Sequence, residues 1–245
     1  MDTNGFSDIH MHIIPGVDDG SATLDMSMKM LAMAWDEGIR TVFATPHYGT
    51  GSCIMTSYDL VEQQYIKLKE RASTQFPDMR IFRGNEIYYE DQCISNWIEK
   101  GKACSMEHSK YILFEFSHYC PSNKIEHALL SVLDKGWWPI LAHTERYPQF
   151  QRHLAAIERL YKCGVYLQIN AYSLEEEKDT SIKNFARQIA ENELAHFIGS
   201  DAHKDYRRTP SMRSGVDFLY EKCRKGYVDD LVQGNAEHIL HGVRI

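Results

Sequence analysis

The chain has 245 residues, with 34 acidic against 27 basic side chains, a formal net charge of −7, and 12 histidines. Because 43% of the residues are apolar and no apolar run is long enough to cross a bilayer, we expect a sizeable core and no membrane insertion. The acidic balance argues against nucleic acid as a partner, since nucleic-acid-binding proteins cluster Lys and Arg.

Short apolar runs alternate along the chain with longer runs of helical periodicity. The predicted strands cover residues 6–10, 41–44, 80–83, 111–116, 139–142, 165–169 and 195–198, and the predicted helices cover 24–37, 58–72, 124–134, 153–163, 182–191 and 212–223. Gly38, Gly136, Gly164 and Gly226 follow four of these helices, where left-handed residues are expected. The alternation predicts an α/β protein with parallel strands, and seven repeats favour a closed barrel over an open sheet.

We find no linker, repeat or low-complexity segment, so we predict one domain over residues 1–245. The first eight residues lack the basic start and apolar stretch of a secretory signal, which predicts a cytoplasmic protein. The six cysteines form no C-x-x-C pair and fit that compartment as free thiols.

Histidines and carboxylates follow the carboxyl ends of six predicted strands. They are His10, His12, Asp18 or Asp19, His47, Glu86, Glu115, His143, Asp201 and His203. In a parallel barrel these ends meet on one face, where barrel active sites are built. Strand alternation also places His10 and His12 on the same side, so both imidazoles can reach one ion.

These residue types predict a metal site. Mixed nitrogen and oxygen ligands suit manganese, iron or zinc better than calcium or magnesium. The candidates outnumber the ligands of one ion, so two or three ions sharing carboxylates is the economical arrangement. Three divalent ions against four carboxylates leave about two positive charges, which hydroxide and a phosphate dianion would balance. Such a site suits hydrolysis of a phosphate ester.

Three points stay open from spacing alone. A lone histidine at a strand end is more often structural, and we give that interpretation to the other seven histidines. Asp18 and Asp19 cannot be separated, although the Asp-Gly step favours Asp19 as a ligand. Asn170 either hydrogen-bonds a ligand or caps the next segment.

In their order and spacing, the motifs resemble the polymerase-and-histidinol-phosphatase (PHP) superfamily over nearly the whole chain. They are His10-Met11-His12, Thr45-Pro46-His47, Gly84-Asn85-Glu86, the Glu115 strand, Ala142-His143 and Ser200-Asp201-Ala202-His203. Residues 17–20, 86–89, 143–147 and 168–171 are similar to its CpsB/YwqE branch, the metal-dependent protein-tyrosine phosphatases of bacterial capsule and exopolysaccharide operons.

The resemblance implies a single-domain, distorted TIM-like (β/α)7 barrel with about three metal ions, most often manganese. It implies that the ligands are His10, His12, Asp19, His47, Glu86, Glu115, His143, Asp201 and His203. Arg146 and Arg208 would contact the substrate phosphate, with Arg207 as a competitor for the second role. The implied substrate is a phosphotyrosine protein, namely the C-terminal tail of a tyrosine autokinase. A homo-oligomer is left open.

We expect a metal-bridging hydroxide to attack phosphorus in line with the departing phenolate, and His143→Ala to abolish activity while the fold stays intact. A cysteine-nucleophile phosphatase is excluded because no cysteine has an arginine six residues later, and no G-x-x-x-x-G-K-[ST] loop is present. The alternatives are a phosphatase for small esters such as histidinol phosphate, a nuclease, which the acidic balance disfavours, and a catalytically idle binding module.

Overall fold

The computed structural model describes residues 5–245, and their strands pair only in parallel within two sheets. One sheet has the order β1-β2-β4 and the other has the order β3-β5-β6-β7-β8-β9. The strands are β1 (Phe6–Met11), β2 (Ile39–Ala44), β3 (His47–Tyr48), β4 (Arg80–Arg83), β5 (Glu86–Tyr88), β6 (Tyr111–Glu115), β7 (Trp138–Leu141), β8 (Tyr166–Asn170) and β9 (Phe197–Gly199). The predicted α/β class with parallel strands is therefore confirmed.

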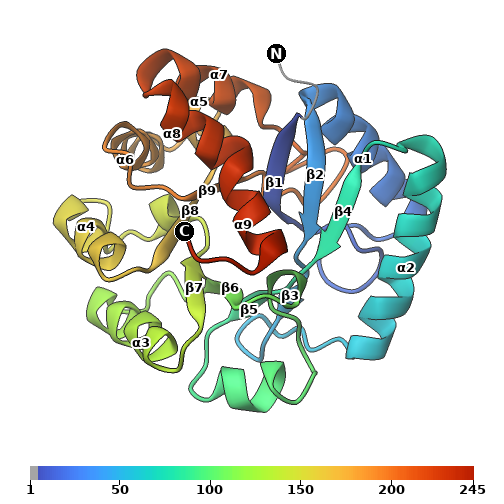
Figure 1. Ribbon diagram of the computed structural model, residues 1–245, viewed down its shortest axis with the longest axis horizontal. Coiled ribbons are helices and arrows are strands. Elements are labelled where there is room, and N and C mark those ends of the chain that lie inside the picture. The colour runs from blue at the N-terminus through green and yellow to red at the C-terminus, as the bar shows by residue number, and fades with distance from the viewer. Residues whose placement is uncertain (1–4) are drawn as a thin grey trace.

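The two sheets curl toward each other at both ends. β2 and β3 are separated only by Thr45 and Pro46, and β4 and β5 only by Gly84 and Asn85, so each pair is one interrupted strand that contributes to both sheets. At the other side, β1 lies beside the end of β9, where His12 N donates to Ala202 O over 2.9 Å. Figure 1 shows these strands at the centre, with α1 to α4 and α6 outside them.

Helices cover the outer faces of the strands. They are α1 (Leu24–Glu37), α2 (Tyr58–Gln75), α3 (Ser122–Asp134), α4 (Leu154–Lys162), α5 (Tyr172–Glu175), α6 (Thr180–Glu191), α7 (Arg213–Lys222), α8 (Lys225–Asp229) and α9 (Asn235–His241). Short 3-10 turns cover Met106–His108 and Thr144–Arg146, and π-helical turns cover Ile94–Ile98 and Asp230–Gly234. Thr23 and Asp179 cap α1 and α6 by accepting hydrogen bonds from first-turn amides.

The six predicted helices all form, each within three residues of its expected bounds. Gly38, Gly136 and Gly164 are left-handed, with φ of +93°, +80° and +88°, as expected of helix C-termini. The prediction for Gly226 is wrong, because α7 ends at Lys222 and Gly226 lies inside the next helix, α8. The interrupted strands β3 and β5 and the short helices α5, α8 and α9 were not predicted, since they are too short to show a period.

One end of the strand array is closed by the C-terminal helix. Ala236 and Ile239 of α9 pack into a buried cluster with Ile9, Phe43 and Leu113 from the strands. Tyr111, the first residue of β6, donates to the main-chain oxygen of Val243 over 2.9 Å. The α9 segment, red in Figure 1, therefore covers the amino ends of the strands and leaves the carboxyl ends as the open face.

No helix formed by the described residues is long and apolar enough to cross a bilayer. The six cysteines are free thiols, as predicted; Cys93 and Cys104 are buried, and Cys53 and Cys163 are exposed.

His196, just before β9, predicts a pH-dependent part of the stability. Its ring stacks on Tyr161 with centroids 4.8 Å apart, and its Nδ1 accepts a hydrogen bond from Leu167 N. Burial lowers the pKa of His196 to about 4 from the ordinary 6.5, so folding holds the ring neutral. The ring therefore does not lower the free energy of unfolding above pH 6.5. As the pH falls from 6.5 to 4, protonation of His196 in the unfolded chain lowers the free energy of unfolding by about 3 kcal/mol.

We therefore expect His196→Asn, in which the amide oxygen can still accept from Leu167, to lose less stability than the wild type between pH 6.5 and 4. Urea unfolding of chelator-treated protein at several pH values measures this difference. His241→Asn, at a histidine whose side chain is 73% exposed, serves as the control. Identical pH slopes for wild type and His196→Asn would contradict the prediction.

Candidate metal centre

All nine predicted ligands lie together at the carboxyl ends of the strands. Three overlapping groups have ligand atoms within 4.8 Å of one another; they are His12, Asp19, His47 and His203; His10, His12 and Glu86; and His47, Glu86 and Glu115. The remaining two adjoin them, because His143 Nε2 is 3.0 Å from Glu86 Oε1 and Asp201 Oδ1 is 3.6 Å from His10 Nε2. The nine candidate ligands, spread between positions 10 and 203 of the sequence, thus lie together in one small volume.

Glu86 occupies the centre of this cluster. Its Oε2 is 2.9 Å from His47 Nδ1 and 3.2 Å from the Nε2 atoms of both His10 and His12. Its Oε1 faces His143. A side chain that is 1% exposed and contacts four imidazoles is arranged to share ions between them.

The interruption between β4 and β5 places Glu86. Asn85, the residue before Glu86, anchors the turn through both ends of its side-chain amide. Asn85 Nδ2 donates to Pro46 O over 3.0 Å, and Asn85 Oδ1 accepts from Cys104 N over 2.8 Å. Gly84 is needed in the same turn, because a Cβ there would lie 2.6 Å from the sulfur of Met106. The register then sets His47 directly opposite Glu86.

Two of the candidate ligands have left-handed backbones. His143 has φ of +32° and Asp201 has φ of +52°, and each is the second residue after the end of its strand, β7 or β9. Such conformations cost about 1 kcal/mol or more in a non-glycine residue and persist where surrounding contacts hold them. His143 N donates to Gln168 Oε1 over 2.7 Å, and Asp201 N donates to His10 O over 2.8 Å. The strain turns both side chains toward the cluster.

The charges of the cluster balance only if protons or cations are present. Burial lowers the pKa of His10, but the carboxylates of Glu86 and Asp201 outweigh it and raise the pKa to about 9. His47 behaves alike, with burial opposed by Glu86 and a pKa raised to about 10. Burial alone would raise the pKa of Glu86, yet these imidazoles hold it well below its usual range. Divalent ions that bind here must displace the histidine protons.

The residues present fit bound metal ions. Glu86 Oε2, His47 Nδ1 and His203 Nε2 are buried and, although the first two lie 2.9 Å apart, none of the three makes a well-aligned hydrogen bond within residues 5–245. Buried polar atoms without partners are costly unless something binds them. Because these atoms are imidazole nitrogens and a carboxylate oxygen that face one another, divalent ions of the manganese, iron or zinc type would satisfy them.

Arg146 and Arg208 reach the same face from two loops. Arg208 Nη2 is 2.5 Å from Asp201 Oδ2, and its side chain stays 41% exposed. Arg146 Nη1 donates to Tyr172 OH over 2.7 Å and to Glu177 Oε2 over 3.2 Å. Both guanidinium groups keep further N–H donors free for an anion. Both Arg207 and Arg208 are exposed, but among the described residues only Arg208 forms an ion pair with Asp201.

Sequence comparison assigns this arrangement to a family. The profile of the family described as "Capsular polysaccharide synthesis, CpsB/CapC" matches residues 6–241. The chain belongs to the CpsB/CapC family. The predicted resemblance to the CpsB/YwqE branch is thereby confirmed.

Two relatives match this chain over nearly the whole length of both proteins. Tyrosine-protein phosphatase CpsB of Streptococcus pneumoniae is 30% identical in an alignment of 238 residues that covers 95% of this chain and 97% of CpsB. Tyrosine-protein phosphatase YwqE of Bacillus subtilis is 28% identical over 97% of this chain and 92% of YwqE.

Solved structures agree with the family assignment. A structure from the work on YwqE of Bacillus subtilis and CpsB of Streptococcus pneumoniae, described as unique metal-dependent tyrosine phosphatases, superposes with a TM-score of 0.85 at 28% identity, covering 97% of this chain and 95% of the other. The histidinol phosphate phosphatase of Lactococcus lactis superposes with a TM-score of 0.57 at 15% identity over 89% of this chain and 93% of the other, a likeness of fold alone.

The structure separates Asp18 from Asp19 in this CpsB/CapC-family chain. Asp18 Oδ2 lies 2.7 Å from His12 Nδ1 and also accepts from His47 N, so this carboxylate orients two histidines. Asp19 Oδ1 lies 3.6 Å from His47 Nε2 and 3.5 Å from His203 Nε2, among the potential ligands. A carboxylate on the far nitrogen of His12 fixes the ring and leaves Nε2 free to bind a metal.

Gln168 is a site residue that the sequence analysis did not identify. Its Oε1 accepts from His143 N, so the atom 3.2 Å from His10 Nδ1 is an oxygen, and that ring nitrogen carries the proton. Once its proton is displaced, His10 Nε2 therefore directs its lone pair at the cluster. Gln168 Nε2 donates to Asn170 Oδ1, and Asn170 Nδ2 donates to Asp201 Oδ2 over 3.2 Å. Asn170 thus hydrogen-bonds a candidate ligand, one of its two predicted roles.

Proposed function

We propose that this chain is a metal-dependent protein-tyrosine phosphatase, like the relatives whose names state that activity. The observation that carries the proposal is Glu86, buried among four imidazoles with unpartnered atoms directed at one another. An idle binding module would have no need for such a costly arrangement.

The proposed ligand set comprises all nine predicted residues and holds about three ions, with manganese as the first choice and iron or zinc as alternatives. It is His10, His12, Asp19, His47, Glu86, Glu115, His143, Asp201 and His203. When bound, the ions acidify water and neutralise charge on phosphate. Asp18 and Gln168 keep the rings of His12 and His10 in the tautomer that presents Nε2.

Arg146 and Arg208 are proposed to bind the phosphate of the substrate. Arg208 is anchored through Nη2 to Asp201, and Arg146 through Nη1 to Tyr172 and Glu177, so each guanidinium is held in place. The remaining N–H groups can donate to equatorial oxygens, on which negative charge concentrates during transfer. The departing tyrosine phenolate, with a pKa of about 10, needs little help from a general acid.

The finer predictions about this chain belong to the same proposal. We propose that the single domain 1–245 is a distorted (β/α)7 barrel in which the interrupted strands β2/β3 and β4/β5 each count once. The two parallel strand orders and the bridge between Met11 and Ala202 support this proposal. We propose a cytoplasmic enzyme whose substrate is the C-terminal tail of a tyrosine autokinase involved in capsule or exopolysaccharide synthesis.

Metal removal tests the proposed activity directly. Chelator-treated protein is expected to lose more than about 100-fold of its kcat/KM on a phosphotyrosine peptide, and Mn²⁺ is expected to restore it. Histidinol phosphate, assayed in parallel, is the control for a small-ester phosphatase. Full activity without metal would contradict the metal-dependent mechanism, and a preference for histidinol phosphate would replace the protein-tyrosine-phosphatase assignment.

A further inference from the structure

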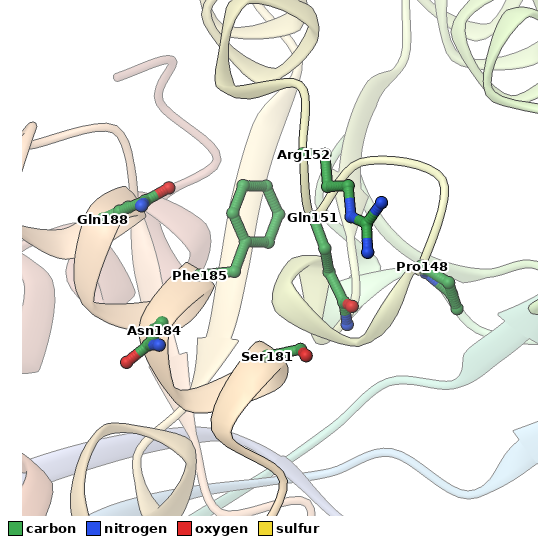
Figure 2. A pocket seen from close by; sticks show the side chains of 7 residues that line it. All are labelled: Pro148, Gln151, Arg152, Ser181, Asn184, Phe185 and Gln188. Atoms are coloured by element: carbon green, nitrogen blue, oxygen red, sulfur yellow. The ribbon is translucent and has the colours of Figure 1, made fainter.

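A pocket of about 500 Å³ lies between α6 and the loop that follows Arg146. Figure 2 shows the two walls facing each other, with Asn184 and Gln188 on the α6 side, Gln151 and Arg152 on the loop side, and Phe185 between them. The proposed phosphatase mechanism uses none of these side chains. The chemistry of this pocket therefore calls for a separate explanation.

The pocket adjoins the proposed phosphate site. Pro148, which lines it, is two residues after Arg146, and Gln151 Nε2 donates to the main-chain oxygen of Glu145 over 3.1 Å. On the other wall, Glu177 accepts from Arg146 and lies four residues before Ser181, another lining residue. An extended polypeptide advances about 3.3 Å per residue, so positions close to a bound phosphotyrosine can reach this pocket.

The lining suits an extended peptide. Asn184 and Gln188 lie one turn apart on the same face of α6 and are exposed, and Gln151 is partly exposed. Each primary amide both donates and accepts hydrogen bonds, as a peptide main chain requires. Phe185, which is 1% exposed, forms an apolar floor.

The charge of the lining selects among peptides. The chain as a whole has a net charge of −7, yet the pocket contains the exposed Arg152 and no acidic side chain among its lining residues. A single cation in a locally uncompensated position attracts carboxylates and repels Lys and Arg.

We propose that this pocket, the 148–188 groove, binds the acidic polypeptide segment next to the phosphotyrosine of the substrate. The inference rests on the proposed phosphatase function and adds a substrate preference to it. Asn184 and Gln188 hydrogen-bond the main chain of the substrate peptide, and Arg152 forms an ion pair with an acidic side chain of that peptide. The groove thereby distinguishes a protein substrate from a small phosphate ester, because a small ester bound at the phosphate site does not extend as far as the groove.

Steady-state kinetics on three substrates test the groove with the full-length, Mn²⁺-loaded enzyme. The substrates are p-nitrophenyl phosphate, a phosphotyrosine peptide flanked by Glu residues, and the same peptide flanked by Lys. For Arg152→Glu we expect kcat/KM on the Glu peptide to fall about tenfold through KM, the value on the Lys peptide to rise, and that on p-nitrophenyl phosphate to stay within about twofold. Lys67→Glu, an exposed site on α2, makes the same charge change elsewhere and is the matched control.

A second variant separates main-chain binding from charge. The double variant Asn184→Ala/Gln188→Ala is expected to raise KM for both peptides by a similar factor and to leave kcat/KM for p-nitrophenyl phosphate unchanged. The proposed role of the groove would be overturned if Arg152→Glu changed kcat/KM equally on all three substrates, or by no more than Lys67→Glu does. If the wild type hydrolyses the phosphotyrosine substrates but neither variant discriminates among them, only the groove fails. If the wild type hydrolyses none of them, the phosphatase function itself fails.

Discussion

Glu86→Gln is expected to lower kcat/KM on phosphotyrosine substrates by roughly 1,000-fold or more, with loss of bound metal. Glu86 Oε2 lies within 3.2 Å of nitrogens from His10, His12 and His47, and no other carboxylate in the described residues contacts as many of the candidate imidazoles. The amide keeps the shape of the side chain but removes the charge that would be shared between ions. Its NH₂ group also cannot act as a ligand.

Two measurements on purified Glu86→Gln check this expectation, namely metal content by elemental analysis and kcat/KM with added Mn²⁺. Glu99→Gln, at an exposed glutamate just past the π-helical turn Ile94–Ile98, is the matched control and should behave as wild type. Circular dichroism and thermal unfolding of both variants report whether the fold is retained. A Glu86→Gln protein that keeps its metal and its activity would remove Glu86 from the proposed centre.

Arg208→Ala is expected to lower kcat/KM by about 100-fold, whereas Arg207→Ala should stay within about twofold of wild type. Arg208 has φ of +50°, and its main-chain oxygen accepts from His203 N, so the loop returns and places this guanidinium 2.5 Å from Asp201. Arg207 lies beside Arg208 in sequence and is also exposed, but it forms no ion pair with Asp201 or any other described residue.

Inhibition by inorganic phosphate distinguishes a phosphate-binding role from a structural one. If Arg208 binds the substrate phosphate, the inhibition constant of phosphate should rise in Arg208→Ala while the metal content stays that of wild type. A fall in metal content would mean that Arg208 acts by holding Asp201 instead. Equal losses in Arg207→Ala and Arg208→Ala would contradict the assignment of either arginine alone.

The kind of site was predictable from the sequence because its information is local. Except for Asp19, each candidate ligand lies at the end of a short apolar run or within five residues after it. Parallel strands bring their carboxyl ends to one face, so residue type and strand order together locate a nitrogen and oxygen cluster. The bounds of the longer helices were predictable for a similar reason, since their apolar periods extend over several turns.

Contacts between distant residues decided the rest. Asp18 and Asp19 are adjacent in the chain, and only the folded loop gives them different partners, since it sets Asp18 against His12 and Asp19 beside His203 from the end of β9. Gln168 resembles any buried polar residue until His143 N and His10 Nδ1 meet its oxygen.

By itself, then, the sequence determined which residues could bind metal and on which face they lie, because strand periodicity and residue chemistry suffice for that. The tertiary structure alone decided which of them direct a ligand atom into the cluster and which orient a neighbour, because that depends on distances between strands that no local pattern encodes. The excess of acidic residues takes on a local meaning in the same way: four carboxylates surround the histidine cluster, while the groove beside it contains an arginine and no acid.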